Sequence, residues 1–240
     1  MKNIIITGAA GNLGKVVSIH FLKKEYRVIA VVRDAAEAET LSEYVNQDAA
    51  NLPVEANLQV EALDLTNEKA VQAFSEKTVR EYGDIGAVLL LAGGFAMGSI
   101  HTTDMQAIKD QLAINFETAY PVARHFFRHM LETGSGRLVF VGTRPALKPS
   151  DGKNMIAYAL SKSLLFNLSE QLNEEAVGSN VVSSVIVPST IDTPANRAAM
   201  PQADVDKWVK PQQIAELLEL ICSETGAPLR ETVLKIYGHS

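Results

Sequence analysis

The sequence predicts an α/β fold, in which one doubly wound parallel sheet of about seven strands carries helices on both faces. Short runs rich in Val, Ile and Leu alternate with longer amphipathic segments along all 240 residues. Most of these runs are apolar without strict alternation, which is typical of strands buried on both faces. No repeat, low-complexity tract or Pro/Gly-rich linker divides the chain, so we expect residues 1–240 to form a single domain.

The expected strands are short and separated by helical patterns. The strands cover Asn3–Thr7, Arg27–Val32, Leu58–Leu63, Ala87–Leu91, Arg137–Val141, Val181–Val187 and Thr232–Tyr237. The helical patterns cover Leu13–Lys24, Glu37–Val45, Glu68–Tyr82, Met105–Leu131, Met155–Ala176 and Gln212–Ser223. Strands and helices that alternate in this way indicate a parallel sheet.

Two segments depart from this alternation. Pro121 lies inside the pattern Met105–Leu131 and should kink or interrupt it, because proline lacks an N–H donor. Residues 188–208, "PSTIDTPANRAAMPQADVDKW", contain three prolines and follow the sixth expected strand. Ligands of open α/β sheets bind beyond the carboxyl ends of the strands, so this segment is a candidate substrate lid. The alternative is an irregular connection.

The composition excludes several classes of protein. The net charge is −6 and no Lys/Arg run exceeds two residues, which argues against a nucleic-acid partner. The N-terminal apolar run is too short for a signal peptide, and no apolar stretch reaches the roughly 18 residues of a membrane span. The single cysteine, Cys222, excludes an internal disulfide and fits a cytoplasmic location. The five histidines lack metal-ligand spacing, so we expect no metal site.

A glycine-rich loop, "TGAAGNLGK" at residues 7–15, joins the first expected strand to the first helix. Its glycines allow a tight turn, close approach of the backbone to a phosphate, and close packing of the helix on the strand. The helix start would offer unpaired N–H groups and a partial positive charge to a dinucleotide pyrophosphate. The candidate cofactor-binding residues of this loop are Gly8, Gly11, Asn12, Leu13 and Gly14.

The end of the second expected strand should meet the adenosine ribose of such a dinucleotide. Its sequence, "VIAVVRD", places Val32 where an NAD-specific fold carries an acidic residue, and Arg33 follows. A guanidinium here suits a 2′-phosphate, so we expect NADP(H) to be preferred, with NAD(H) as the alternative. Asp34 would either cap the next helix or reach a ribose 2′-hydroxyl.

The stretch "YALSK" places Tyr158 and Lys162 on one face of a helix. An ammonium group one turn away stabilises a phenolate, so Lys162 should lower the pKa of Tyr158 from about 10 toward working pH. We interpret the two residues as a proton-transfer pair; the alternative is a half-buried tyrosine beside a solvated lysine.

Taken in order, these motifs resemble the short-chain dehydrogenase/reductase superfamily over nearly the whole chain. The matching elements are the glycine loop at 7–14, "LDLT" at 63–66, "LLAGG" at 90–94, Asn115, "RLVFVGT" ending at Thr143, "YALSK" at 158–162 and "PSTIDT" at 188–193. The resemblance implies a Rossmann-type fold and an NAD(P)-dependent oxidoreductase that acts on a small-molecule substrate.

The resemblance also implies a role for each matching residue. Cofactor contacts would come from Asp64 and Leu65 at the adenine, Ala92 and Gly93 at the ribose side, Tyr158 and Lys162 at the nicotinamide ribose, and Ile191 and Thr193 at the nicotinamide carboxamide. Catalytic roles would fall to Tyr158 as proton donor, Lys162 as its partner, Asn115 at a helix break, and Thr143. Thr143 stands where the family usually carries Ser; it would either donate to a substrate oxygen or merely end the strand.

Some segments resemble dihydropteridine reductases in particular, namely "AGGFAMG" at 92–98 and "DTPANRAAMPQAD" at 192–204, followed by Trp208. Arg33 departs from those NADH-using enzymes, and Asn115 and Thr143 look like the general short-chain reductases. We therefore expect a small carbonyl or quinonoid substrate.

Other functions stay open at this stage. The glycine spacing also resembles extended-type nucleotide-sugar epimerases and dehydratases, although only about 45 residues follow Thr193 to form their substrate domain. A non-catalytic NAD(P)-binding redox sensor is the other alternative.

By analogy with the family we expect a homodimer or homotetramer, built on helices 105–131 and 155–176. Their apolar residues exceed what one face of each helix needs, namely Phe126, Phe127, Leu164, Leu165 and Phe166.

Overall fold

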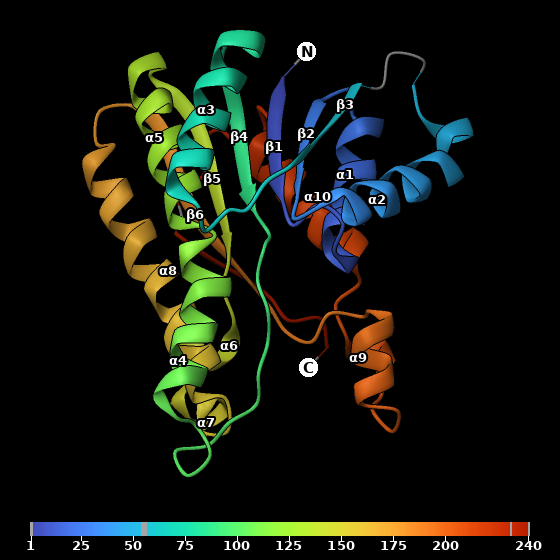
Figure 1. Ribbon diagram of the computed structural model, residues 1–240, viewed down its shortest axis with the longest axis vertical. Coiled ribbons are helices and arrows are strands. Elements are labelled where there is room, and N and C mark those ends of the chain that lie inside the picture. The colour runs from blue at the N-terminus through green and yellow to red at the C-terminus, as the bar shows by residue number, and fades with distance from the viewer. Residues whose placement is uncertain (1, 54–56, 231, 240) are drawn as a thin grey trace.

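Seven strands form one sheet in the computed structural model, which describes residues 2–53, 57–230 and 232–239. They are β1 (Asn3–Thr7), β2 (Arg27–Val32), β3 (Asn57–Ala62), β4 (Ile85–Leu90), β5 (Ser135–Val141), β6 (Asn180–Pro188) and β7 (Val233–Ile236). Every neighbouring pair is parallel, in the order β3-β2-β1-β4-β5-β6-β7 (Figure 1). The predicted doubly wound parallel sheet is confirmed.

The helices cover both faces of this sheet. Those of the described ranges are α1 (Asn12–Lys23), α2 (Ala35–Gln47), α3 (Glu68–Tyr82), α4 (Met105–Leu112), α5 (Tyr120–Thr133), α6 (Arg144–Leu147), α7 (Pro149–Gly152), α8 (Ile156–Glu175), α9 (Pro194–Ala199) and α10 (Pro211–Cys222). One face carries α1, α2 and α10, and the other α3, α5 and α8, while α4, α6, α7 and α9 extend beyond the carboxyl ends of the strands (Figure 1). None of the helices in these ranges is long and apolar enough to cross a membrane.

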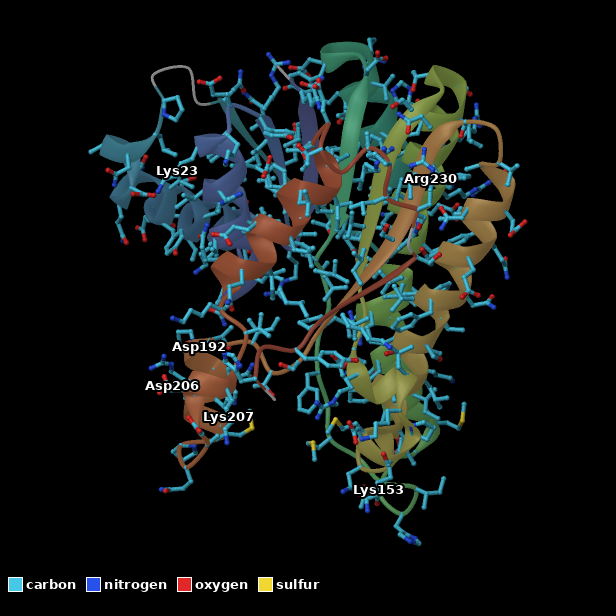
Figure 2. The ribbon with its side chains drawn as sticks, turned by 180° about the vertical axis from the view of Figure 1, so that it is seen from behind. Lys23, Lys153, Asp192, Asp206, Lys207 and Arg230 are labelled. Atoms are coloured by element: carbon cyan, nitrogen blue, oxygen red, sulfur yellow. The ribbon has the colours of Figure 1, made fainter. Side chains whose placement is uncertain are left out.

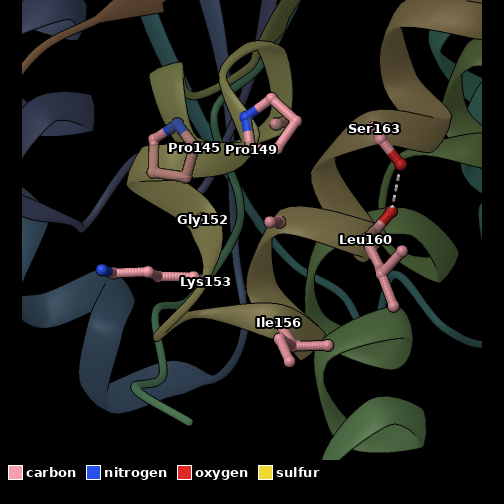
Figure 3. Close-up of a pocket in the computed structure, with 9 residues that line it drawn as sticks. Pro145, Pro149, Gly152, Lys153, Ile156, Leu160 and Ser163 are labelled. Atoms are coloured by element: carbon pink, nitrogen blue, oxygen red, sulfur yellow. Dashed lines mark hydrogen bonds between the residues drawn. The ribbon is translucent and has the colours of Figure 1, made fainter. Parts of the chain in front are cut away.

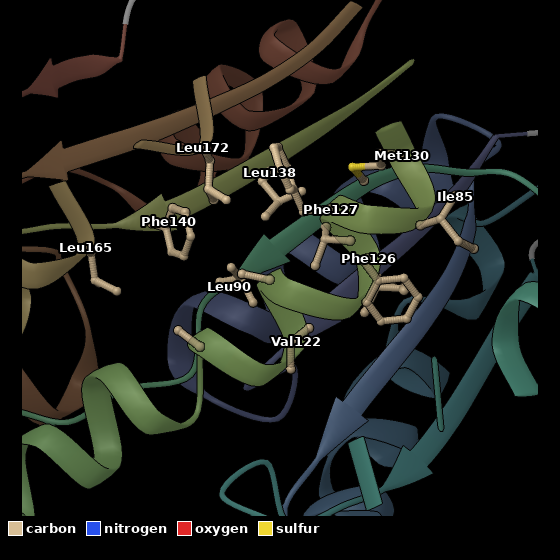
Figure 4. Packing of buried hydrophobic residues seen from close by; sticks show 14 of the residues in the cluster. Ile85, Leu90, Val122, Phe126, Phe127, Met130, Leu138, Phe140, Leu165 and Leu172 are labelled. Atoms are coloured by element: carbon tan, nitrogen blue, oxygen red, sulfur yellow. The ribbon is translucent and has the colours of Figure 1, made fainter. Parts of the chain in front are cut away.

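The core consists of two apolar layers, one on each face of the sheet. Along β1, Ile5 packs into the layer of α3, α5 and α8, which includes Phe126 and Leu165 (Figure 4). Ile4 and Ile6 point to the opposite face and pack with α1, α2 and α10. Because successive side chains of a strand alternate between faces, a strand covered on both sides is apolar throughout. Each such buried side chain contributes roughly 1.5–3 kcal/mol.

The helical pattern 105–131 is broken, as Pro121 predicts, but the break begins before the proline. Helix α4 ends at Leu112, a π-helical turn covers Ala113–Glu117 (η2), and α5 starts at Tyr120 with Pro121 in its first turn. Proline is tolerated there, because the first N–H groups of a helix have no intrahelical partner. The π-helical turn places Asn115 inside the protein, where it is fully buried.

Two expectations from the sequence need correction. The short helices α6, α7 and α9 lie in segments without predicted structure, because four to six residues are too few to show a helical period. The apolar residues ascribed to a subunit contact mostly serve the core of this chain. Phe126, Phe127, Leu165 and Phe166 are buried in it, and only Leu164 is exposed, at 40%.

Candidate active site

The candidate residues gather at the carboxyl edge of the sheet, where the strand order reverses between β1 and β4. The connection after β1 leads to one face and the connection after β4 to the other, so the two loops diverge and leave room for a ligand. The two strand ends are tied together, because the backbone N–H of Ala92 donates to Oγ1 of Thr7 at 3.2 Å.

The glycine loop needs glycine at two positions for reasons visible in the structure. Gly8 has a φ of +64°, and a Cβ there would lie 2.8 Å from the backbone of Ala92. A Cβ on Gly14 would lie 2.2 Å from the carbonyl oxygen of Gly8, so only glycine lets α1 approach the loop this closely. The loop is closed by a bond of 3.0 Å from the N–H of Gly11 to the carbonyl of Gly8.

The start of α1 suits an anionic group. No side chain caps this end of the helix, its first turn contains no acidic residue, and Gly11 and Asn12 are exposed. The free N–H groups and the helix dipole are therefore available to a phosphate. Leu13 instead packs partly buried against the apolar layer of α1 and α10. This cradle fits the pyrophosphate of a dinucleotide.

The adenosine end of such a ligand would lie after β2 and β3. Asp34 caps α2, since its Oδ1 accepts from the N–H of Glu37 at 2.9 Å, which resolves the alternative left open by the sequence. Arg33 is 75% exposed in its side chain and pairs with Glu37 at 2.8 Å. Asp64 accepts two hydrogen bonds from Thr66, which hold the pKa of its carboxyl below the ordinary value.

The adjacent Leu65 is buried in the core, so its side chain is directed into the protein. Arg33 and Asp64 follow β2 and β3, which β1 and β4 separate from β5 in the order of the sheet.

Tyr158 and Lys162 project from the first turns of α8 toward the end of β5. The Tyr158 hydroxyl is hydrogen-bonded to Thr143, two residues beyond the end of β5, and the ring of Phe95 meets Tyr158 edge to face at 5.1 Å. Nζ of Lys162 donates to the carbonyl of Val141 at 2.9 Å, and the residue is only 5% exposed. Burial lowers the pKa of Lys162 to about 8.

The pKa of Tyr158 is raised in the structure, whereas the sequence led us to expect a lowered value. Burial raises it above the ordinary value, and the hydrogen bond with Thr143 offsets only part of this rise. The expected lowering by Lys162 is not found in this structure, where its ammonium group donates to the carbonyl of Val141. The Tyr158 hydroxyl is therefore protonated at neutral pH.

Asn115 joins the loop after β4 to α8. Its Oδ1 accepts from the N–H of Gly94 at 3.0 Å. Its Nδ2 has three acceptors in reach, the Gly94 carbonyl at 3.0 Å, Ser161 Oγ at 3.1 Å and Gln111 Oε1 at 3.2 Å. Ser161 in turn donates to the carbonyl of Tyr158 at 2.8 Å. Sequence reasoning missed Gln111 and Ser161 as supports, although the first precedes Asn115 by one turn and the second lies within "YALSK".

Gly93 lies where these groups meet. A Cβ on Gly93 would lie 2.7 Å from Oδ1 of Asn115 and 3.1 Å from Nζ of Lys162. The structure thus brings Gly93, Asn115 and Lys162 into one cluster, beside the Thr143–Tyr158 pair. The cluster offers a proton donor, a buried ammonium group and a backbone without side chains, over which a flat ring can lie.

The segment 188–208 forms a projection on the other side of the same edge, opposite the projection that carries Lys153 (Figure 2). Ile191 is fixed by a bridge to Val209, and its carbonyl accepts from Nδ2 of Asn196 at 2.8 Å. Thr193 caps α9 through its Oγ1. Asp192 holds Arg197 with two contacts of 2.6 and 2.8 Å, which raise the pKa of Arg197.

A groove of about 280 Å³ lies outside this cluster. It is lined by Pro145, Ala146, Pro149, Gly152, Lys153, Ile156, Ala159, Leu160 and Ser163 (Figure 3). On α8 it is lined by Ile156, Ala159, Leu160 and Ser163, and neither Tyr158 nor Lys162 is among its lining residues. The groove is therefore distinct from the candidate catalytic residues.

Two other kinds of chemistry find no support. Within the described residues no group of three or more His, Cys, Asp and Glu side chains is placed to hold a metal ion. Burial raises the pKa of the Cys222 thiol to about 12, so it is protonated and a poor nucleophile.

Comparison with known proteins gives a consistent result. The family model for short chain dehydrogenase matches residues 2–204. The dihydropteridine reductase of Dictyostelium discoideum is 26% identical over 239 residues, which cover 98% of this chain and 94% of that protein. The acetoacetyl-CoA reductase of an Acinetobacter species is 24% identical over 248 residues, covering 99% and 96%. The solved structure of ElxO with NADP bound aligns at a TM-score of 0.87, covers 99% of this chain and 97% of its own, and is 20% identical.

Proposed function

We infer that this chain, which belongs to the short chain dehydrogenase family, is an NAD(P)H-dependent reductase of a small carbonyl or quinonoid compound. It is an enzyme of the oxidoreductase type, as are the relatives that it matches. The observation that carries the proposal is the convergence of the Thr143–Tyr158 pair with buried Lys162 beside Gly93. The epimerase and sensor alternatives have no comparable observation in their favour.

The residues of the cradle would hold the cofactor along the carboxyl edge of the sheet. We assign the pyrophosphate to Gly11, Asn12 and the open start of α1, with Gly8 and Gly14 shaping the loop. Ala92 and Gly93 would line the ribose side, and Ile191 and Thr193 the carboxamide. Asp64 and the backbone of Leu65, whose side chain is buried in the core, would contact the adenine. When bound, the nicotinamide supplies the hydride.

Tyr158 would give its proton to the substrate atom that gains negative charge. Its raised pKa keeps the hydroxyl protonated at neutral pH, as a general acid requires. Thr143 would share the substrate oxygen as a second donor. The ammonium group of Lys162, once released from the carbonyl of Val141, would stabilise the phenolate left on Tyr158. Asn115 would fix the loop and α8 relative to each other.

We propose NADPH as the preferred reductant, with NADH as the alternative. Arg33 at the end of β2 supports this preference, because a guanidinium binds a 2′-phosphate through paired hydrogen bonds. Its side chain is exposed and would reach a ligand without moving the backbone.

The segment 188–208 would act as the substrate lid of a single domain, 1–240. The one cysteine supports a cytoplasmic location.

Turnover by the purified protein tests the proposal. We would follow oxidation of NADPH, and separately of NADH, with quinonoid dihydropterin and with acetoacetyl-CoA as acceptors. We expect turnover with a small carbonyl or quinonoid acceptor and a lower KM for NADPH than for NADH. Tight nucleotide binding without turnover of dihydropterin would leave a reductase of a different carbonyl substrate. Tight binding without turnover of any carbonyl or quinonoid compound would contradict the reductase and favour the sensor.

Phe95 should form part of the substrate site, because its ring is 59% exposed and stands edge to face against Tyr158. A flat substrate can pack on this ring while it accepts a proton from Tyr158. For Phe95→Ala we expect KM for the substrate to rise about tenfold while kcat changes little, since an apolar contact is lost equally in ground and transition state. Ile100→Ala, at an exposed residue of the same connection, is the control and should leave KM unchanged.

We also propose a homodimer or homotetramer in which the outer face of α8 packs against a second copy. Leu160 and Leu164 are 51% and 40% exposed there, beside the groove of Figure 3. Light scattering should show a dimer or tetramer, and Leu164→Glu should reduce it to smaller species. Val177→Glu, at an exposed residue beyond the end of α8, should not. A wild-type monomer at all concentrations would refute this contact.

A further inference from the structure

Glu37 occupies the place at the end of β2 where the sequence lacks an acidic residue. It lies in the first turn of α2, and its Oε2 accepts from the backbone N–H of Arg33 at 2.8 Å. Its Oε1 accepts from Nη2 of the Arg33 side chain, also at 2.8 Å. One carboxylate therefore binds both the backbone and the guanidinium of Arg33, and is held at the end of the strand.

The local charge around Arg33 does not favour a phosphate in this arrangement. Asp34 approaches Nε of Arg33 at 3.5 Å, while Glu37 approaches Nη2. One guanidinium thus faces two carboxylates, and a phosphate dianion would meet a net negative group. Each Glu37 oxygen accepts one of these bonds and has a lone pair left, so the carboxylate can still accept from a hydroxyl.

Arg33 can leave this pair at little cost. Its side chain is 75% exposed, and exposed ion pairs are weak because water and salt screen them. Glu37 in contrast stays in place through its bond to the backbone N–H. The two residues therefore suit two different ligands at one position, a ribose hydroxyl on Glu37 and a 2′-phosphate on the released Arg33.

We propose that Glu37 determines coenzyme choice in this protein, by accepting the ribose 2′-hydroxyl of NAD(H) and by competing with a 2′-phosphate for Arg33. The protein consequently uses both coenzymes, and the preference of Arg33 for NADP(H) is held in check by Glu37. This inference rests on the proposed nucleotide-binding function. It deepens that function by naming the acidic residue, which comes from the helix rather than from the strand.

Direct binding tests the proposal without relying on turnover. Dissociation constants of NADPH and NADH, and of the fragments 2′,5′-ADP and 5′-AMP, would be measured by calorimetry for the wild type, Glu37→Gln and Arg33→Gln. The glutamine keeps the bond to the Arg33 N–H through its amide oxygen but removes the charge. Glu39→Gln, an exposed carboxylate two residues further along α2, controls for the loss of one charge.

In Glu37→Gln we expect NADPH and 2′,5′-ADP to bind about fivefold more tightly and NADH about fivefold more weakly. Arg33→Gln should weaken NADPH about tenfold and leave NADH within about twofold. An NADPH/NADH ratio in Glu37→Gln that equals that of Glu39→Gln, or that shifts toward NADH, overturns the role of Glu37. A wild type that binds neither nucleotide overturns the proposed function as well, so the two failures are distinguishable.

Discussion

Replacing Tyr158 by phenylalanine is expected to lower kcat about a thousandfold while nucleotide binding stays within about twofold. The change removes only the hydroxyl that would give the proton, and the remaining ring can keep its edge-to-face contact with Phe95. The hydrogen bond to Thr143 is lost, but Thr143 is a hydroxyl that can turn toward water or substrate. Steady-state rates with saturating NADPH, together with calorimetric dissociation constants, measure both quantities.

Tyr120→Phe is the matched control for this variant. Tyr120 is 41% exposed, at the start of α5, and stacks on Phe116. It should retain wild-type turnover. If Tyr158→Phe kept more than a tenth of the wild-type rate with a substrate that the enzyme reduces efficiently, another group would have to supply the proton.

The pH profile provides a second readout of the same residue. Burial raises the pKa of Tyr158 above its ordinary value of 10, so the hydroxyl stays protonated through neutral pH. Loss of the donor through ionisation is therefore not expected below about pH 10 in the reductive direction. A decline in rate that begins near pH 8 would instead follow Lys162, whose pKa burial lowers to about 8.

The sheet and its two covering layers follow from the sequence because they depend on local pattern. Runs such as Asn3–Thr7 and Arg27–Val32 contain consecutive apolar residues rather than alternating apolar and polar ones. A strand covered by helices on both faces satisfies that pattern. The glycine loop can also be predicted from the sequence, because Gly8 is required by a positive φ angle and Gly14 by a close backbone contact.

The supports of the candidate site are less predictable, because they depend on contacts between distant residues. The π-helical turn that buries Asn115 has no sequence signature, so its bonds to Gly94 and Ser161 could not be foreseen. Glu37 reads as an ordinary residue of an amphipathic helix, and only the turn at Asp34 directs its carboxylate to the N–H of Arg33. The pKa of Tyr158 likewise depends on how deeply the side chain is buried and which groups surround it, and neither can be determined from the sequence alone.

Replacing Lys162 by methionine is expected to abolish turnover and yet stabilise the fold at neutral pH. The ammonium group is the polar end of a side chain that is only 5% exposed, and burial lowers its pKa from 10.5 to about 8. Keeping it charged in the folded state therefore costs about 3 kcal/mol at pH 7. Methionine fills nearly the same volume without a charge, but leaves the carbonyl of Val141 without its donor, at a cost of about 1–2 kcal/mol. The net gain in the free energy of unfolding should be about 1–2 kcal/mol.

The sign of this effect should change with pH. Because the folded-state pKa of Lys162 lies below the unfolded value, the unfolded chain binds more protons between about pH 8 and 10.5. The contribution of Lys162 to stability thus rises across that window, and the advantage of Lys162→Met should vanish or reverse near pH 10. Urea denaturation of both proteins at pH 7 and pH 10 measures it, with Lys153→Met as the exposed control, which should stay within about 0.5 kcal/mol of the wild type at both. A variant less stable than the wild type by the same amount at both pH values would show that Lys162 is retained for packing. A variant more stable than the wild type at pH 7 but not at pH 10 would show that the fold tolerates an unfavourable charge because the reaction requires it.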